Sequence, residues 1–518
     1  MARPLAHSRN KKRRFKHTDG SVGVIRISRR GYGFVATPEG EYFIPRGNIY
    51  GAMDGDVVQV VRMRRLEERR RSQTKNAGEG RRDMLGSVKR VIERAHTTVV
   101  GMLHYRDGLG VVTPSDARIC HDIFIDPRAI GVPAVDGDVV EVRLTTYPSR
   151  LEAAQGYIEE VVGHHDERGM DIELIIRRHK LETAFSAAAL EEAARLAESA
   201  MQAALQSVAA VDGGDSPTAT ATALATAAAA PIAVTDIGAT PVDESLPRRD
   251  LRERFIFTID PSDARDFDDA LSVDFIEGQM LVGVHIADVS AYVAWESSVD
   301  LDARRRATSV YLPDRVLPML PPQLSDDLCS LKPNEDRLAF TCDMLMRSDG
   351  TVQSYELYPS LIRSRARLSY DEVQAFFDDN EASSESLSQV ESRIQAETLV
   401  QTQPCVPTAS AIREDLRLQN RLRVLNRLAK KLVRRREARG AIDFESIEAK
   451  VSLDESGKPV AVTLREKTDA TSLVEEAMIL TNEVVANHML THQAAMVYRI
   501  HEEPFQAALE QLLPTLQE

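Results

Sequence analysis

Two short motifs each occur twice in the N-terminal third of the chain, about 82 residues apart, and they constrain the fold more than any other feature. Phe-Ile-Pro-Arg at 43–46 returns as Phe-Ile-Asp-Pro-Arg at 124–128, and Asp-Gly-Asp-Val-Val at 54–58 returns at 136–140. Short strand-like runs, separated by Gly and Asp, precede and follow both copies. This spacing is typical of small β-barrels. The repeat therefore predicts two barrels in tandem.

The repeat and the composition around it divide the chain into six segments. Residues 206–240 are rich in Ala and Thr and too simple to bury much surface, and 381–408 form a second polar insert. The last segment begins with strands and then gains long helices, an order that indicates an α+β domain. We expect a basic disordered arm at 1–18, a first barrel at 19–65, an arginine-rich linker at 66–94, a second barrel at 95–163, a helical segment with the disordered insert at 164–247, and the α+β domain at 248–518.

Charge is distributed unevenly along the chain. The net charge is −14, yet residues 1–94 carry 23 Lys and Arg against 10 Asp and Glu, a local balance of +13 that leaves −27 for the remainder. Counterions released from phosphates drive basic segments onto nucleic acid. The N-terminal part is therefore expected to bind nucleic acid, although a basic tail can also be a solvated, nonspecific feature.

Aromatic and basic residues interleave in the first predicted barrel. Arg29 and Arg30 precede Tyr32 and Phe34, and Phe43 lies on the next predicted strand. Aromatic side chains on strands beside cations form a platform for the bases of a single strand. The alternative is that the rings fill the barrel, which we expect for at least one of Phe34 and Phe43. The partner expected here is single-stranded RNA, and the second barrel, with fewer aromatic residues, is expected to guide it less directly.

The cysteines and the apolar segments indicate in which cellular compartment the protein is expected. Cys120, Cys329, Cys342 and Cys405 lie far apart without C-x-x-C spacing, so neither a disulfide framework nor a zinc site is expected. That usage fits a reducing compartment. No run is long and apolar enough to span a bilayer, and no apolar segment follows the basic N-terminus. We expect a cytoplasmic protein that does not bind membranes.

The strongest chemical signal lies at 255–273, F-I-F-T-I-D-P-S-D-A-R-D-F-D-D-A-L-S-V. An apolar strand ends at Asp260, and Asp266, Asp268 and Asp269 precede a second apolar strand. Carboxylates gathered in this way raise one another's pKa unless a cation offsets them. Oxygen ligands suit Mg²⁺ or Mn²⁺, which can activate water and stabilise a leaving oxygen. The alternatives are an acidic surface loop or a calcium site.

The string from Ile259 to Leu271 resembles the metal-binding motif of the RNase II/RNase R (RNB) family, and is closer to the RNase R type. The likeness runs from about residue 20 to 505, except for the two inserts. It implies two cold-shock-type OB barrels followed by an incomplete α+β RNB catalytic domain. Further matching strings are H-I-A-D-V-S at 285–290, T-S-V-Y-L-P at 308–313, P-M-L-P at 318–321, L-S-D-D-L-C-S-L at 324–331, G-A-I-D-F-E at 440–445 and V-E-E-A-M at 474–478.

The resemblance also implies roles for individual residues. Asp260, Asp266 and Asp269 match metal ligands, and Asp268 matches the carboxylate that completes the site for attack by water. The implied reaction is processive 3′→5′ hydrolysis of single-stranded RNA to nucleoside 5′-monophosphates with Mg²⁺, by a monomer whose protein partners are not indicated. The residues that match contacts to the 3′-terminal nucleotides are Tyr311, Tyr370, Phe444 and Glu475.

One part of the family pattern is absent from these 518 residues. The family carries an arginine in an S-P-I-R-R motif, and then a further OB domain, beyond the point that matches Glu518. A helix-turn-helix domain that many RNase R-type proteins carry at the N-terminus is also absent. We therefore expect a fragment whose activity is doubtful. A noncatalytic RNA-binding protein and a DNA-directed metal nuclease are the alternatives, and only recognition of the 2′-hydroxyl would separate the latter from a ribonuclease.

Overall fold

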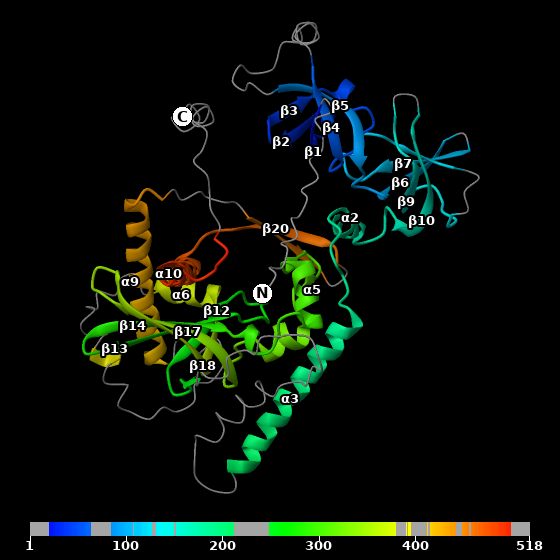
Figure 1. Ribbon diagram of the computed structural model, residues 1–518. Coiled ribbons are helices and arrows are strands. Elements are labelled where there is room, and N and C mark those ends of the chain that lie inside the picture. Colours follow the sequence, from blue (N-terminus) through cyan, green and yellow to red (C-terminus); the bar gives the residue numbers. More distant parts are fainter. Residues whose placement is uncertain are drawn as a thin grey trace, which may run out of the picture. The chain divides into compact units, whose positions relative to one another are not determined.

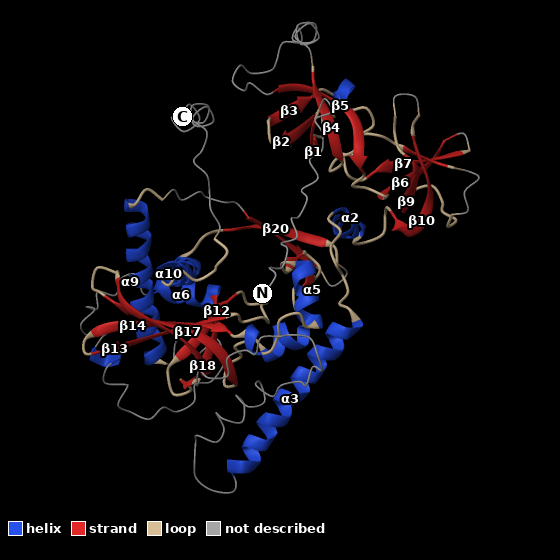
Figure 2. Ribbon diagram, viewed as in Figure 1, coloured by secondary structure: helices blue, strands red, loops and turns tan. Residues whose placement is uncertain are grey.

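The computed structural model describes residues 20–63, 84–106, 108–126, 131–149, 152–211, 248–379, 390, 392–394, 412, 415–441, 448–454 and 457–498, with no side-chain detail for 201–211. Contacts divide it into one compact unit up to Leu181 and another from Glu182 to Arg499. Strands dominate the first unit, and helices cover a sheet in the second (Figures 1 and 2). None of the described helices is long and apolar enough to cross a membrane. The basic arm at 1–18, the insert beyond Val211, and Phe444 lie outside the described residues.

The first barrel is closed by five strands in the order β1-β2-β3-β5-β4. The fifth strand corrects a predicted boundary, because it lies in the stretch 66–94 that was expected to be a linker. It closes the barrel by pairing parallel to β3 and antiparallel to β4, so both of their open edges are satisfied. The elements are β1 Ser21–Ile27, β2 Gly33–Thr37, β3 Gly40–Ile44, η1 Arg46–Asn48, β4 Val57–Arg62 and β5 Met84–Glu93.

Alternation along β2 and β3 decides which side chains fill this barrel. Val35, Tyr42 and Ile44 are buried in its core. Phe34 and Phe43, which are register partners on the two strands, are only half-buried. Because successive side chains point to opposite faces, both phenylalanines lie on the outer face. The expectation that at least one of them fills the barrel is wrong.

The second barrel repeats the connectivity of the first, with strand order β10-β8-β7-β6-β9. The first strand of each barrel has a glycine against a neighbouring backbone: a Cβ on Gly23 or Gly101 would lie 2.2 or 2.4 Å from the carbonyl oxygen of Ala36 or Thr113, respectively. The prediction of two tandem OB-type barrels is confirmed. The elements are β6 Thr98–Arg106, β7 Leu109–Pro114, β8 Ile123–Ile125, β9 Asp138–Thr146, β10 Ala154–His164 and the helix α2 Met170–Arg178.

The second unit is built on a six-stranded sheet in the order β11-β18-β12-β13-β14-β17. The long strand β18 pairs antiparallel with β17 along most of its length and parallel with β12 along its last part. The elements are α3 Ala187–Val211, β11 Arg249–Asp250, β12 Ile256–Asp260, β13 Asp269–Ile276, β14 Gln279–Ala287, η2 Val289–Ala291, α5 Ser298–Arg306, β15 Val310–Tyr311, β16 Val316–Leu317, η3 Leu324–Leu328, β17 Asp336–Met346, β18 Val352–Ser369, α6 Tyr370–Asp379, α9 Leu416–Ala438, β19 Glu448–Leu453, β20 Pro459–Arg465 and α10 Asp469–Thr491.

Each face of this sheet has its own apolar core. Helices α6, α9 and α10 cover one face, where Phe257 and Ile259 of β12 are buried. Ile256 faces the other side and packs with residues of α3 and α5. A strand buried on both faces reads as a continuous apolar run, which is the pattern of β12. The strand that ends on Asp260 is therefore held from both sides.

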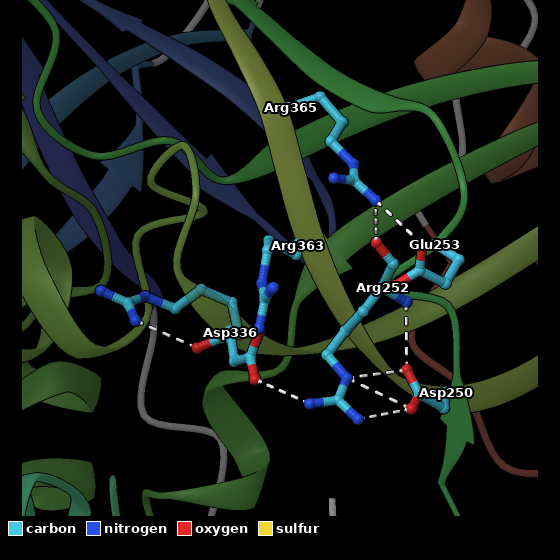
Figure 3. A network of polar contacts seen from close by, with 7 residues as sticks. Asp250, Arg252, Glu253, Asp336, Arg363 and Arg365 are labelled. Atoms are coloured by element: carbon cyan, nitrogen blue, oxygen red, sulfur yellow. Dashed lines mark hydrogen bonds and ion pairs between the residues drawn. The ribbon is translucent and has the colours of Figure 1, made fainter. Parts of the chain in front are cut away.

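An arginine–carboxylate network fixes the segment that leads into β12 (Figure 3). The Arg252 guanidinium lies 2.6 Å from Asp250 and 3.1 Å from Asp336. Arg363 of β18 contacts the second oxygen of Asp336 at 2.6 Å, and Arg365 donates to the Arg252 carbonyl at 2.8 Å. Charge-assisted contacts of this kind hold geometry more firmly than neutral ones. They join the chain before β12 to β17 and β18.

Candidate metal and RNA site

The four predicted aspartates come together where β12 turns into β13. Asp260 is the last residue of β12, is 8% exposed, and lies opposite Ser369 at the end of β18. Asp269 is the first residue of β13 and is half-buried. Asp266 and Asp268 lie on the turn between the two strands, the first half-buried and the second exposed. The turn therefore places four carboxylates along one edge of the sheet.

Burial and mutual repulsion disfavour the charged forms of these carboxylates. Desolvation, followed by the neighbouring Asp269, raises the pKa of Asp260 to about 7. Desolvation and the charge of Asp268 raise the pKa of Asp269 to about 6. Although Asp268 is exposed as a residue, desolvation of its carboxylate and the nearby Asp266 raise its pKa as well.

A cation would relieve this repulsion, and the donor set fits one. The Oδ2 atom of Asp260 is buried and has no hydrogen-bond partner. A buried polar atom without a partner is unfavourable by roughly 1–3 kcal/mol or more. Oxygen ligands from several carboxylates are those preferred by Mg²⁺ and Mn²⁺. The residue types present therefore suit an oxygen-liganded divalent cation, although the four carboxylates do not bring ligand atoms within 4.8 Å of one another as a group.

A buried serine from a distant segment fixes one half of the acidic turn. Ser330 is 1% exposed, and its Oγ accepts a hydrogen bond from the Phe267 N–H at 3.0 Å. The same hydroxyl donates to the Arg265 carbonyl at 2.7 Å, and the Leu331 N–H donates to the Phe267 carbonyl at 2.9 Å. These bonds hold the backbone on either side of Asp266. Sequence reasoning did not single out Ser330, although it lies in the matching string 324–331.

An arginine on β18 fixes the other half. Arg367 donates to the carbonyl oxygens of Ser262 at 2.7 Å and Ala264 at 3.2 Å. Its guanidinium lies 5.0 Å from the centre of the Phe267 ring, and its charge lowers the pKa of Asp260 against the larger opposing causes. Sequence reasoning missed Arg367 too. The available signal was its position three residues before the predicted Tyr370.

Tyr311 is the predicted RNA-contacting residue that the structure joins directly to the aspartates. Its hydroxyl donates to Asp266 Oδ2 at 2.9 Å, while its side chain stays 66% exposed. It lies on the two-stranded hairpin of β15 and β16. Desolvation, followed by the bond to Asp266, raises the pKa of the phenol to about 12. The ring is thus anchored at its polar end and open along its face.

The other predicted contact residues are placed less directly. Tyr370 opens α6 immediately after Ser369, the register partner of Asp260, and its ring packs partly buried against the core under the helices. Glu475 is exposed on α10 and forms an ion pair with Lys467 at 2.9 Å.

The first barrel presents a separate aromatic face. The rings of Tyr32, Phe34 and Phe43 contact one another, with centroids 5.5–5.7 Å apart. Arg29 and Arg30 are exposed on the adjoining turn. This turn is closed by backbone hydrogen bonds from the Ser28 N–H to the Tyr32 carbonyl and from the Gly31 N–H to the Ser28 carbonyl. Three rings beside two cations form the kind of surface on which unpaired bases stack.

Three family models match the chain. The RNB domain model matches residues 248–518, the cold shock domain model matches 112–186, and the Ribonuclease B OB domain model matches 23–79. The matches fall on the second unit and on the two barrels, and they agree with the observed architecture.

Individual relatives extend these matches over most of the chain. Ribonuclease R of Aquifex aeolicus is 30% identical over 510 residues, covering 98% of this chain and 60% of the relative. Ribonuclease R of Thermotoga maritima is 32% identical over 498 residues, covering 95% and 59%. The chain thus spans about 60% of the length of these relatives.

Solved structures share the fold. Mycoplasma genitalium RNase R in complex with ribose-methylated single-stranded RNA aligns with a TM-score of 0.71 at 21% identity, covering 96% of this chain and 66% of that one. Yeast Ssd1, described as a pseudonuclease, aligns with a TM-score of 0.61 at 15% identity, covering 96% and 58%. One fold thus carries both a nuclease and a pseudonuclease.

Proposed function

The chain belongs to the RNB family, and from that premise we propose that it is a cytoplasmic, metal-dependent 3′→5′ exoribonuclease. It acts as a monomer on single-stranded RNA and releases nucleoside 5′-monophosphates processively, with Mg²⁺ or, in its place, Mn²⁺. The observation that carries this proposal is the acidic turn, where the raised pKa of Asp260 and Asp269 and the buried Oδ2 of Asp260 call for a divalent cation.

The four carboxylates have two different roles in hydrolysis. Asp260, Asp266 and Asp269 hold the cation, and Asp268 orients the attacking water. Bound there, the cation supplies positive charge that polarises the scissile phosphate and lowers the pKa of water. The water oxygen bonds to phosphorus as the bond to the 3′ oxygen breaks, so the shortened RNA keeps a 3′-hydroxyl and the released nucleotide keeps its 5′-phosphate. Ser330 and Arg367 are positioning residues, since they hold the backbone that carries these carboxylates.

Aromatic side chains hold the substrate without reading its sequence. The exposed face of Tyr311 stacks near the scissile end, and Phe444 forms the second half of a clamp on the terminal bases. Tyr370 and Glu475 contact the terminal nucleotides. In the first barrel, Tyr32, Phe34 and Phe43 stack bases, while Arg29 and Arg30 contact phosphates. Because every base has a face on which to stack, these contacts suit an enzyme that must advance along any RNA.

A noncatalytic RNA-binding protein is the alternative, and the pseudonuclease among the structural relatives shows that the fold alone does not decide. The intact aspartates favour hydrolysis. A pseudonuclease has no need to keep four carboxylates in a desolvated turn where three of them acquire raised pKa values.

A degradation assay tests the proposal. The 518-residue chain is incubated with Mg²⁺ and a single-stranded RNA labelled at its 5′ end. The label is expected to move to progressively shorter species, free nucleoside 5′-monophosphates are expected to accumulate, and EDTA is expected to stop both. RNA that binds the protein and stays full-length with Mg²⁺ or Mn²⁺ present would establish the noncatalytic alternative instead.

A further inference from the structure

Two histidines and an aspartate gather at the end of the second barrel, within the first compact unit. His164 ends β10, and His165 and Asp166 follow it. One ligand atom from each of the three side chains lies within 4.8 Å of the others, and the two rings pack at a centroid distance of 4.5 Å. All three side chains reach solvent, with exposed fractions of 38%, 40% and 79%.

The protonation of the His165 ring follows from its hydrogen bonds. Both its backbone N–H and its Nδ1 point at the Gly137 carbonyl, at 3.1 and 3.0 Å. A carbonyl can only accept, so Nδ1 carries a proton and Nε2 is the ring nitrogen left for another partner. That Nε2 lies 3.1 Å from Asp166 Oδ1, which is an acceptor. An imidazole nitrogen and a carboxylate oxygen at this distance share either a proton or a metal ion.

His164 adds a second imidazole nitrogen to the same place. The Asp166 backbone N–H points at its Nδ1 at 3.4 Å, and because an N–H can only donate, this Nδ1 is an acceptor. It lies 3.9 Å from Asp166 Oδ2. The ligand atoms of two imidazoles and a carboxylate therefore lie close together, and a metal at His164 Nδ1 would take the place of the long contact from the Asp166 N–H.

A glycine keeps the two rings in this arrangement. Gly137 has φ +88°, and a Cβ built on it would lie 2.8 Å from His164 Nε2 and 3.1 Å from His165 Nδ1. No other residue would fit beneath the rings without displacing them. The donation from His165 Nδ1 to a backbone carbonyl is also the arrangement that orients histidines which ligate metals.

The first barrel shows what replaces this cluster at the matching position. Val57 pairs with Glu93 there and Val139 pairs with Gly163 in the second barrel, so His164 takes the position of Arg94. The Arg94 guanidinium lies 2.9 Å from Asp56, within the first Asp-Gly-Asp turn. The first barrel thus supplies its own cation at this corner, and the second barrel has a histidine in its place.

We propose that His164, His165 and Asp166 bind a divalent transition metal of the zinc type, at a site distinct from the catalytic aspartates. Imidazole nitrogens with one carboxylate suit Zn²⁺ better than Mg²⁺, and water completes the coordination of an exposed site. Because its three ligands are consecutive, the ion fixes the end of β10, while the contact of His165 Nδ1 with the Gly137 carbonyl links that end to the turn before β9.

Metal titration of the 518-residue chain tests this proposal. Calorimetry with Zn²⁺ is carried out with Mg²⁺ in excess, so that the aspartates are already occupied, and Co²⁺ absorption reports nitrogen ligation independently. One equivalent of Zn²⁺ is expected to bind at micromolar concentrations. His165→Ala and Asp166→Asn are each expected to weaken binding at least about tenfold. His179→Ala, which alters an exposed histidine after α2, and Asp268→Asn are expected to leave it unchanged.

The opposite results would overturn the site. Zn²⁺ that does not bind up to millimolar concentration would mean that the cluster holds only a proton shared between His165 and Asp166. Zn²⁺ that binds His165→Ala and Asp166→Asn like the parent, or that is lost in Asp268→Asn, would place the ion elsewhere. Circular dichroism of each variant confirms that the barrels remain folded.

Discussion

The aromatic face of the first barrel and the acidic turn of the second unit differ in whether their side chains find interaction partners within the protein itself. On the barrel, Tyr32, Phe34 and Phe43 already contact one another and need nothing more to receive a base. On the turn, Asp260 has a raised pKa and an oxygen without a partner. The contrast is between a surface whose aromatic side chains already pack against one another and a turn whose carboxylates lack a compensating positive charge.

Removal of the Asp268 charge is expected to have the largest effect. Asp268→Asn keeps the shape of the side chain but loses the carboxylate that orients water, so turnover is expected to fall at least about 10³-fold, close to what one preorganised group contributes. RNA affinity is expected to stay within about twofold of the parent. Single-turnover degradation and filter binding measure the two quantities.

A matched control lies in the same turn. Asp263 is an exposed aspartate whose carboxylate lies 3.5 Å from Lys450, and Asp263→Asn is expected to degrade RNA at nearly the parental rate. Equal losses in both variants would mean that overall charge matters and that Asp268 has no specific role.

Metal and pH are expected to change the stability of the second unit next most strongly. Because the pKa values of Asp260 and Asp269 are raised to about 7 and about 6, the folded state holds protons that the unfolded state has already lost. Stability without metal is therefore expected to fall as pH rises from about 4 to about 7. At pH 8, Mg²⁺ at a hundredfold excess over its Kd is expected to restore about 2.7 kcal/mol.

Thermal unfolding at pH 5 and pH 8, with and without Mg²⁺, measures this linkage. The rise in Tm on adding Mg²⁺ is expected to be larger at pH 8, where no proton competes for the carboxylates. A rise that is equal at both pH values, or that persists in Asp260→Asn, would contradict the assignment of these carboxylates as ligands.

The aromatic face is expected to matter for affinity alone. Phe43→Ala removes one stacking surface and is expected to weaken RNA binding about tenfold, within the range of about 1–3 kcal/mol for one stacked base. Phe124, in the repeated motif of the second barrel, is also exposed, and Phe124→Ala is expected to change binding less than twofold. Turnover at saturating protein is expected to be unaffected in both. Equal losses of affinity would mean that the two barrels grip RNA alike.

The smallest expected effect is that of the barrel cations. Replacement of Arg29 and Arg30 by Gln removes two phosphate contacts, so the slope of log affinity against log salt is expected to decrease in magnitude by about 1.4 for a single strand. Arg143→Gln on the second barrel, where the arginine is paired with Glu159 at 2.8 Å, is expected to leave the slope unchanged. Filter binding across a salt series measures the slope for both variants. An unchanged slope in the double variant would mean that Arg29 and Arg30 do not contact RNA phosphates.

The features that could be predicted from the sequence are those encoded by short, local motifs. The repeated Asp-Gly-Asp turns predicted two barrels, and five aspartates within ten residues, four of them assigned to the site, predicted the acidic turn. Strand β5 was not predicted, because exposed Lys89 and Arg90 interrupt its apolar residues and make the stretch look like a charged linker. Barrel closure, a nonlocal requirement, makes it a strand.

The positioning residues were not predicted either, because their contacts with the acidic turn are also nonlocal. Ser330 and Arg367 reach the acidic turn from 63 to 105 residues further along the chain. A single serine or arginine on an ordinary segment has no periodic signature. The orientation of Phe34 and Phe43 could have been read from alternation against Val35 and Ile44, had the inward set of the barrel been assigned first.

The parallel pairing of β12 with β18 has a consequence for how the protein is made. Ile256 pairs with Ser364, so the support under the aspartates closes only after 108 further residues have left the ribosome. Each barrel closes within a much shorter stretch, and contacts between distant residues form slowly. During synthesis the nascent chain is therefore expected to complete its two barrels first, and β12 gains its neighbour only when β18 arrives. A ribosome that stalls before that point would carry a chain with both barrels but without the strand that lies beside Asp260.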